Sequence, residues 1–133
     1  MGNRPFRGQC LCGAITYEVT SLSGATHCHC KTCQRASGAA FMTWVDAPRE
    51  KLRILSGVPR ERRSSKIAVR SFCPDCGSQL FMSYDGEPSV GISVGTLDDA
   101  RDVAGEDNIW TRSRLKPLFN IGDCHCCQSE GCG

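Results

Sequence analysis

Seven of the eleven cysteines fall into three tight clusters. The clusters are Cys10 with Cys12, Cys28 with Cys30 and Cys33, and Cys73 with Cys76. Thiolates at such spacings are typical zinc ligands, and a purely structural zinc takes four protein ligands whereas a catalytic zinc takes three and keeps one position open. Seven thiolates therefore divide into one closed site and one open site, and we expect two zinc ions per chain.

The most specific local signal is the segment Phe72 to Gly77, which reads F-C-P-D-C-G. Pro74 fixes one backbone torsion, and Gly77 can adopt the left-handed conformation that closes a tight turn. Such a turn directs Cys73 and Cys76 toward the same ion. Two thiolates do not complete a tetrahedron, so this turn needs a second pair from elsewhere, and either of the other clusters could supply it.

Cys10 and Cys12 fit the role of that second pair. They lie two residues apart in G-Q-C-L-C-G, so on an extended segment both side chains point to the same face. Joining them to Cys73 and Cys76 closes a long loop, where a crosslink removes the most entropy from the unfolded chain. Cysteines buried as small hydrophobic residues are the alternative, which so regular a spacing disfavours.

The remaining cluster lies in the segment 27–33, H-C-H-C-K-T-C. A short helix is expected over 31–37, ended by Gly38, and it would place Cys30 and Cys33 one turn apart near its start. The helix dipole favours thiolates there, and Lys31 and Arg35 add positive charge. This arrangement favours thiolates at Cys30 and Cys33, which suit a metal site.

Two histidines accompany these cysteines. His29 could be a fourth ligand that closes the site, but neighbouring residues on an extended chain point to opposite faces, which favours His29 packing or orienting a neighbour. We expect His27 to be structural or exposed.

The elements around the clusters are mostly short strands separated by glycine. Alternating or β-branched patterns predict strands over 14–19, 41–45, 52–55, 66–72, 79–83 and 90–94. Helix is scarce, with one further turn expected around 97–100. No repeat or long linker divides the chain, so we expect a single domain over 1–123, followed by a cysteine-rich tail over 124–133.

Charge and targeting signals narrow the classes of partner. The 16 basic and 14 acidic residues give a net charge of +2, which gives no electrostatic case for nucleic acid or membrane surfaces. No stretch has the length of a signal peptide or a membrane span. We therefore expect a cytoplasmic, reducing location, where clustered cysteines are metal ligands or redox groups more often than disulfides.

In this order the motifs resemble the glutathione-dependent formaldehyde-activating enzymes, relatives of centromere protein V. The resemblance rests on G-x-C-x-C-G at 8–13, C-H-C-x-x-C at 28–33 and F-C-x-x-C-G at 72–77, and extends to 95–98 and Trp110, covering about residues 6–120. It implies a mostly β fold, the β-tent, with short antiparallel sheets held by zinc. It also assigns the metal ligands: a structural site of Cys10, Cys12, Cys73 and Cys76, and a catalytic site of Cys28, Cys30 and Cys33.

The same resemblance implies a carbon–sulfur lyase reaction in which glutathione and formaldehyde form S-hydroxymethylglutathione, with a small-molecule thiol and aldehyde as partners. Zinc with three thiolates carries a formal charge of −1, so it acidifies water poorly but can hold an incoming thiol as thiolate. Glutathione has two carboxylates, and Arg35 is the first candidate to bind one. The weaker candidates are Arg62, Arg63, Arg112 and Arg114.

Two other functions stay open beside the lyase reaction, and the chain departs from the family pattern in two places. A zinc-stabilised interaction module without catalysis would have its second site closed by His29 or another group, and nucleic-acid binding is disfavoured by the low charge.

Relatives often carry histidine where this chain has Asn108. The tail adds Cys124, Cys126, Cys127 and Cys132, which could bind a soft metal ion or form disulfides, or could be incidental on a flexible segment.

Overall fold

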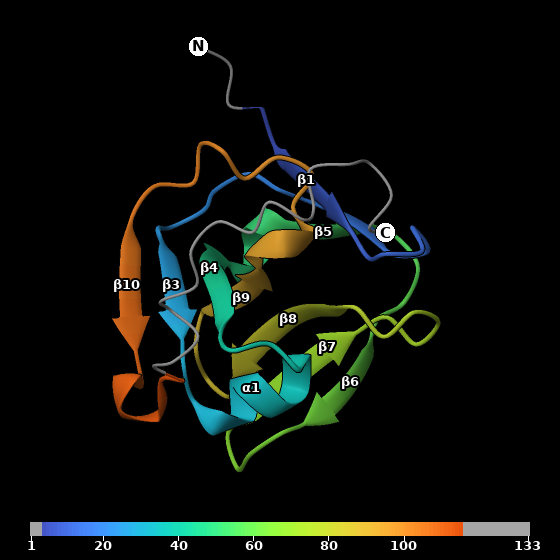
Figure 1. The fold of residues 1–133 in the computed structure, drawn as a ribbon. Coiled ribbons are helices and arrows are strands. Elements are labelled where there is room, and N and C mark those ends of the chain that lie inside the picture. Colours follow the sequence, from blue (N-terminus) through green and yellow to red (C-terminus); the bar gives the residue numbers. More distant parts are fainter. Residues whose placement is uncertain (1–3, 116–133) are drawn as a thin grey trace, which may run out of the picture.

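The computed structural model describes residues 4–115, and strands form most of its regular structure (Figure 1). The strands are β1 (Phe6–Gln9), β2 (Thr16–Val19), β3 (Ala25–Cys28), β4 (Met42–Pro48), β5 (Leu52–Ser56), β6 (Arg60–Arg63), β7 (Ala68–Phe72), β8 (Gln79–Tyr84), β9 (Ser89–Ser93) and β10 (Glu106–Ile109). The helical elements are α1 (Lys31–Ser37) and the 3-10 turns η1 (Arg49–Lys51), η2 (Val94–Thr96) and η3 (Thr111–Ser113). The expectation of a mostly β fold with very little helix is confirmed.

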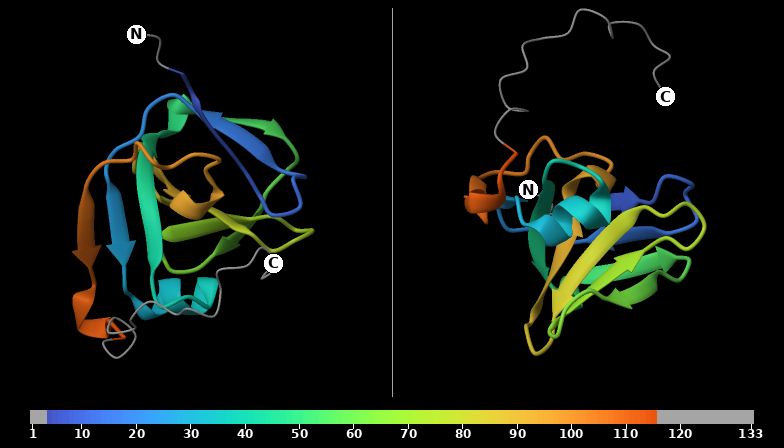
Figure 2. Two further views of the ribbon diagram at one scale, coloured as in Figure 1. Left: turned by 45° about the horizontal axis from the view of Figure 1, so that its top comes forward. Right: turned by 60° about the horizontal axis from the view of Figure 1, so that its bottom comes forward.

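The strands form two sheets. One has the order β1-β2-β5, and the other has the order β10-β3-β4-β9-β8-β7-β6. Figures 1 and 2 show the larger sheet curving so that β8, β7 and β6 turn away from β3 and β10, with α1 across the concave side. The pairs are antiparallel except one, because β10 runs parallel to β3. The expected antiparallel sheets are thus observed except for this pair, because a long connection over 94–105 carries the chain back before β10 begins.

Side chains from both sheets meet in the main core. Tyr17 of β2 packs edge-on against Phe81 of β8, with ring centroids 5.0 Å apart, and both are buried. The Tyr17 hydroxyl is hydrogen-bonded to Thr96 Oγ1 at 2.7 Å. Gly8 lies directly over this ring, and a Cβ there would come within 2.3 Å of it. A glycine at this position of β1 therefore leaves room for the Tyr17 ring that packs against Phe81.

The expected strands fall on observed ones. The ranges 14–19, 41–45, 52–55, 66–72, 79–83 and 90–94 overlap β2, β4, β5, β7, β8 and β9, whereas β1, β3, β6 and β10 were not expected. The turn expected around 97–100 is wrong, since the 3-10 turn comes earlier, at η2. Leu97 is instead buried and bridges to Gly8.

The expected helix over 31–37 is α1, with a cap at each end. Cys30 is its N-cap, and the Cys30 sulfur accepts a hydrogen bond from the Cys33 amide at 3.2 Å. Gly38 ends the helix with φ 71°, a conformation that favours glycine. In the described part of the chain, no helix has the length and apolar character of a membrane span. The tail over 124–133 lies outside the described residues.

Candidate metal centres and the adjoining cavity

The first cysteine group joins two turns from different sheets. Cys10 and Cys12 lie in the turn between β1 and β2, and Cys73 and Cys76 lie in the turn between β7 and β8. All four sulfurs lie within 4.8 Å of one another, with 3.6 Å from Cys10 to Cys12 and 3.8 Å from Cys12 to Cys73. Four thiolates around a tetrahedral ion at about 2.3 Å have sulfurs about 3.8 Å apart. These four residues could therefore hold a metal ion.

Backbone geometry and Ser78 fix the two turns against each other. Gly77 has φ 77° and donates its amide to the Cys73 carbonyl at 2.8 Å, which closes the second turn. The Ser78 hydroxyl oxygen accepts a hydrogen bond from the Leu11 amide at 2.9 Å and lies 3.2 Å from the Cys76 sulfur. The hydroxyl of Ser78 and its backbone amide lower the pKa of Cys76 to about 5. Cys76 is thus a sulfur that its surroundings favour as thiolate.

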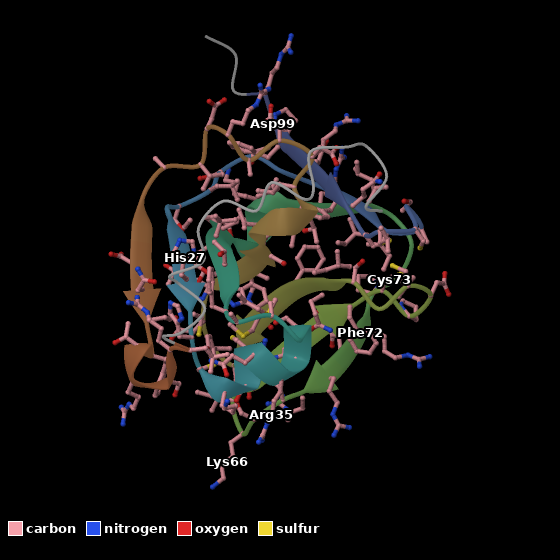
Figure 3. All side chains as sticks on the ribbon, viewed as in Figure 1. His27, Arg35, Lys66, Phe72, Cys73 and Asp99 are labelled. Atoms are coloured by element: carbon pink, nitrogen blue, oxygen red, sulfur yellow. The ribbon has the colours of Figure 1, made fainter. Side chains whose placement is uncertain are left out.

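The second cysteine group comes from one short segment. Cys28 is the last residue of β3, Cys30 caps α1, and Cys33 lies in the first turn of α1. Their sulfurs also lie within 4.8 Å of one another, so this group too could hold a metal ion. In Figure 3, Cys73 lies at the right of the molecule and Arg35 at the bottom on α1, so the two groups occupy separate places.

A second, smaller apolar cluster encloses this group. Cys28 and Cys33 are buried together with Met42 and Trp44 of β4. The buried Arg70 donates a hydrogen bond from its guanidinium to the Cys33 sulfur at 3.4 Å. The pKa of Cys33 is lowered to about 5, first by the hydrogen bond with Cys28 and next by those from Arg70, Cys30 and Trp44, against the effect of burial. Cys33 is thus the sulfur that this environment favours as thiolate.

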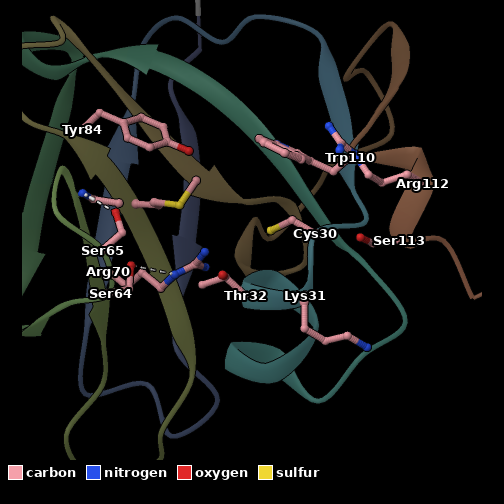
Figure 4. Close-up of a pocket in the computed structure, with 12 residues that line it drawn as sticks. Cys30, Lys31, Thr32, Ser64, Ser65, Arg70, Tyr84, Trp110, Arg112 and Ser113 are labelled. Atoms are coloured by element: carbon pink, nitrogen blue, oxygen red, sulfur yellow. Dashed lines mark hydrogen bonds between the residues drawn. The ribbon is translucent and has the colours of Figure 1, made fainter.

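A cavity of about 410 Å³ opens beside Cys30. Figure 4 shows the Cys30 sulfur facing a space bounded by Tyr84 on one side, Trp110 on the other and Arg70 below. The remaining lining residues are Lys31, Thr32, Ser64, Ser65, Ala68, Met82, Arg112 and Ser113. Trp110 has φ 56°, rare for a non-glycine residue, and lies half exposed at the mouth of this cavity. A small molecule in this space would reach Cys30 with aromatic rings on two sides and polar groups on the others.

The two histidines hold neighbouring strands rather than joining the sulfurs. Within residues 4–115, neither group of clustered ligand atoms includes a histidine. His29 is buried, packs against Phe41, and its Nε2 lies 2.8 Å from Asn108 Oδ1 on β10. The nitrogen Nδ1 of His27 lies 2.7 Å from the hydroxyl of Thr43 on β4. Asn108 thus takes a structural role beside His29 at the edge of the sheet.

The arginine candidates lie on two different cavities. Arg35, Arg62 and Arg63 line a second cavity of about 530 Å³, which shares Lys31, Thr32, Ser64 and Arg70 with the first. Arg63 forms an ion pair with Asp85 at 2.8 Å. Arg112 lines the first cavity, with its guanidinium 5.6 Å from the Trp110 ring centre. Arg114 follows η3 and is partly buried.

Sequence reasoning missed Arg70 and Tyr84. A signal existed for Arg70: in β7 it lies two residues from both Ala68 and Phe72, so a charge falls on the inward face of an alternating strand. A strand with an inward charge needs a partner inside the fold. Tyr84 has no comparable signal, because only the curvature of the large sheet brings the end of β8 over Cys30.

Comparisons with known proteins agree with this arrangement. Residues 5–113 match the family described as glutathione-dependent formaldehyde-activating enzyme. An uncharacterized lyase of Schizosaccharomyces pombe is 30% identical over 80 residues, which make up 59% of this chain and 58% of that protein. A crystal structure of a Rhodobacter sphaeroides protein matches with a TM-score of 0.62 and 25% identity, covering 77% of this chain and 98% of that one.

The extent of these matches differs. The match with the S. pombe relative spans little more than half of that protein's length, while the family match runs from β1 through η3. It includes both cysteine groups and every strand among the described residues. The chain belongs to the glutathione-dependent formaldehyde-activating enzyme family.

Proposed function

We propose that this protein is a zinc-dependent enzyme of the carbon–sulfur lyase type, acting on an adduct of a thiol and an aldehyde. Both cysteine groups would hold zinc, because soft thiolate donors in a tetrahedral arrangement suit that ion. The single observation that carries the proposal is the cavity beside Cys30, which would give a three-thiolate site an accessible open side. Free, reduced cysteines are required at both groups, so we place the protein in the reducing cytoplasm.

The three-cysteine group, Cys28, Cys30 and Cys33, would form the reacting site. Zinc bound there supplies an open coordination position that keeps an incoming thiol as thiolate at neutral pH. Bond formation joins the thiol sulfur to the aldehyde carbon, and the carbonyl π electrons move to the oxygen, which takes up a proton. The reverse step breaks that carbon–sulfur bond and returns the proton, so the reaction balances without another reactant.

Tyr84 is suited to supply and recover that proton. Its side chain lines the cavity, and burial raises the pKa of its hydroxyl, helped by the nearby sulfurs of Cys28 and Cys33. A tyrosine with a raised pKa stays protonated at neutral pH and can donate a hydrogen bond to the developing oxyanion. Trp110 and Met82 provide apolar surface in the same space.

Glutathione and formaldehyde are the substrates that we propose first. Glutathione is a thiol with two carboxylates, and the second cavity, beside the first, is lined by Lys31, Arg35 and Arg62. We propose that Arg35 binds one of the glutathione carboxylates, which would lie in this basic cavity while the sulfur reaches Cys30. The size of the basic cavity, about 530 Å³, is that of sites for small organic ligands.

Exchange spectroscopy of glutathione and formaldehyde tests the proposal. The zinc-loaded protein should accelerate both formation and breakdown of S-hydroxymethylglutathione over the spontaneous rate. Cys30→Ser is the matched control, and S-methylglutathione should bind much more weakly than glutathione because it cannot form a thiolate. No acceleration, together with equal binding of the two analogues, would favour the non-catalytic interaction module. Acceleration only with other thiols would keep the reaction and reject glutathione.

A further inference from the structure

Arg70 is a buried cation at the wall of the three-cysteine group. Its side chain is 6% exposed, and its guanidinium makes three polar contacts: with the Cys33 sulfur at 3.4 Å, the Ser64 hydroxyl at 3.2 Å and the Met42 sulfur at 3.9 Å. The guanidinium also lies 5.9 Å from the centre of the Trp44 ring. Figure 4 shows it pointing toward Cys30 across the floor of the cavity.

These contacts leave the positive charge of Arg70 without a carboxylate. Arg70 takes part in none of the described ion pairs, which join Arg7 and Arg53 to Glu18, Arg63 to Asp85, and Arg101 to Asp99, all at exposed arginines. A buried guanidinium is costly unless a nearby negative charge compensates it. The nearest groups that can carry negative charge are the sulfurs of the cysteine group, and Cys33 already accepts its hydrogen bond.

We propose that Arg70 is the counter-ion of the three-cysteine metal site and the residue that positions Cys33 for it. A divalent ion with three thiolates has a formal charge of −1, which the guanidinium brings to zero. When a substrate thiolate joins, a step that rests on the proposed function, the total becomes −1 instead of −2. The main effect of Arg70 is therefore to favour retention of the metal, and its smaller effect is to favour binding of the substrate thiolate.

The pairing geometry supplies a matched control. In the register of β6 and β7, Arg62 is the direct neighbour of Arg70, but its side chain is exposed, whereas that of Arg70 is buried. The two residues share side-chain type, sheet and strand position, and they differ in burial and in contact with sulfur. Arg62→Met removes a positive charge from the same region without touching the cysteine group.

Zinc competition with a chelator tests the role of Arg70 without any substrate. Arg70→Met should weaken the zinc at the three-cysteine group about 10- to 100-fold relative to Arg62→Met, the range found when residues that orient metal ligands are removed. Zinc at the four-cysteine group should stay bound in both variants, which reports that the fold is intact. Equal affinity of the three-cysteine group in Arg70→Met and Arg62→Met would overturn the proposal.

Arg70→Lys keeps the test decisive if the methionine variant does not fold. Lysine retains the charge but lacks the planar guanidinium that reaches Cys33, Ser64 and Met42 together. We expect intermediate zinc affinity, and in the cobalt-substituted protein a shift of the sulfur-to-cobalt charge-transfer band. A folded lysine variant with unchanged affinity and band would overturn the positioning role. Neither result depends on turnover, so an inactive wild-type protein would contradict the proposed function and leave this proposal standing.

Discussion

The two cysteine groups differ in how far apart in the chain their members lie. The four-cysteine group joins the β1–β2 turn of the smaller sheet to the β7–β8 turn of the larger one. The three-cysteine group spans only residues 28–33, at the junction of β3 and α1. A crosslink between sheets stabilises the whole fold, whereas a crosslink within six residues holds only its own segment.

The surroundings of the two cysteine groups also differ, since one group lies in the main core and the other borders a cavity. Cys10 and Cys73 are part of the main core, beside residues from both sheets. The three-cysteine group belongs to the smaller cluster with Met42 and Trp44, and a cavity borders Cys30. From this comparison we propose that the four-cysteine group serves stability and the three-cysteine group serves access to a ligand, and each prediction tests one of these two roles.

The largest expected effect is on folding, from Cys73→Ser. Cys73 is fully buried, and metal binding at a structural zinc site is worth roughly 10–16 kcal/mol of apparent free energy, as much as the net stability of a typical domain. We expect the variant to lose cooperative thermal unfolding in circular dichroism. Ser78→Ala, which leaves all four sulfurs, should remain folded and serves as the control. A Cys73→Ser protein that unfolds cooperatively at the wild-type temperature would show that the two sheets do not depend on this site.

Cys30→Ser should separate activity from folding. Serine is a good N-cap, so its hydroxyl can replace the sulfur that accepts the Cys33 amide hydrogen bond and keep α1 in place. We expect a melting temperature near that of the wild type, with one metal ion lost and the exchange rate at the spontaneous level. If this variant unfolded as readily as Cys73→Ser, the contrast between the two groups would be wrong.

Tyr84→Phe tests the catalytic role that we propose for the cavity beside Cys30. Removing a proton donor typically costs roughly 10²-fold or more in rate, and we expect a loss at the low end because serine hydroxyls line the same cavity. The raised pKa of Tyr84 means that its proton is kept to a higher pH than in a free tyrosine, about 10. The wild-type rate should therefore fall only above that pH, and this decline should be absent in the variant. An unchanged rate constant at neutral pH would remove Tyr84 from the mechanism.

The smallest expected effect is from Arg35→Met. An exposed arginine bound to a carboxylate contributes about 0.2–1 kcal/mol, so KM for glutathione should rise roughly 1.4- to 5-fold at constant kcat. Arg101→Met is the control, because Arg101 pairs with Asp99 at the opposite end of the molecule (Figure 3). Equal KM values in the two variants would place the carboxylates elsewhere.

The sequence was most informative where spacing is local. The segment 27–38 predicted α1 together with its cysteine and glycine ends, because capping depends on residues close in the chain. The alternating strands were also predictable, whereas β6 and β10 are rich in charged or polar residues and lack an apolar alternation; in the structure they pair with β7 and β3. The residue pattern within β6 or β10 does not show which strand it pairs with.

In the candidate site, too, features that depend on local spacing could be predicted and long-range contacts could not. The seven clustered cysteines and their division into four and three were predicted from spacing, and the structure brings the sulfurs together in those two groups. Tyr84 and Trp110 come from β8 and from the segment after β10, so their meeting at Cys30 depends on the curvature of the large sheet. The position of Arg70 on the inward face of β7 could be predicted from the strand pattern, but its contact with Cys33 could not.

Metal content, with the ligands of each ion, tests the central claim most directly. We predict two zinc ions per chain in the reduced protein by native mass spectrometry, with one remaining in Cys30→Ser. X-ray absorption should show four sulfurs around the remaining ion, and in the wild type an average of fewer than four, because the second ion has three cysteines and an exchangeable ligand. A single zinc per chain after zinc is added back, with Cys28, Cys30 and Cys33 free to alkylate, would contradict the division into a structural and an open site.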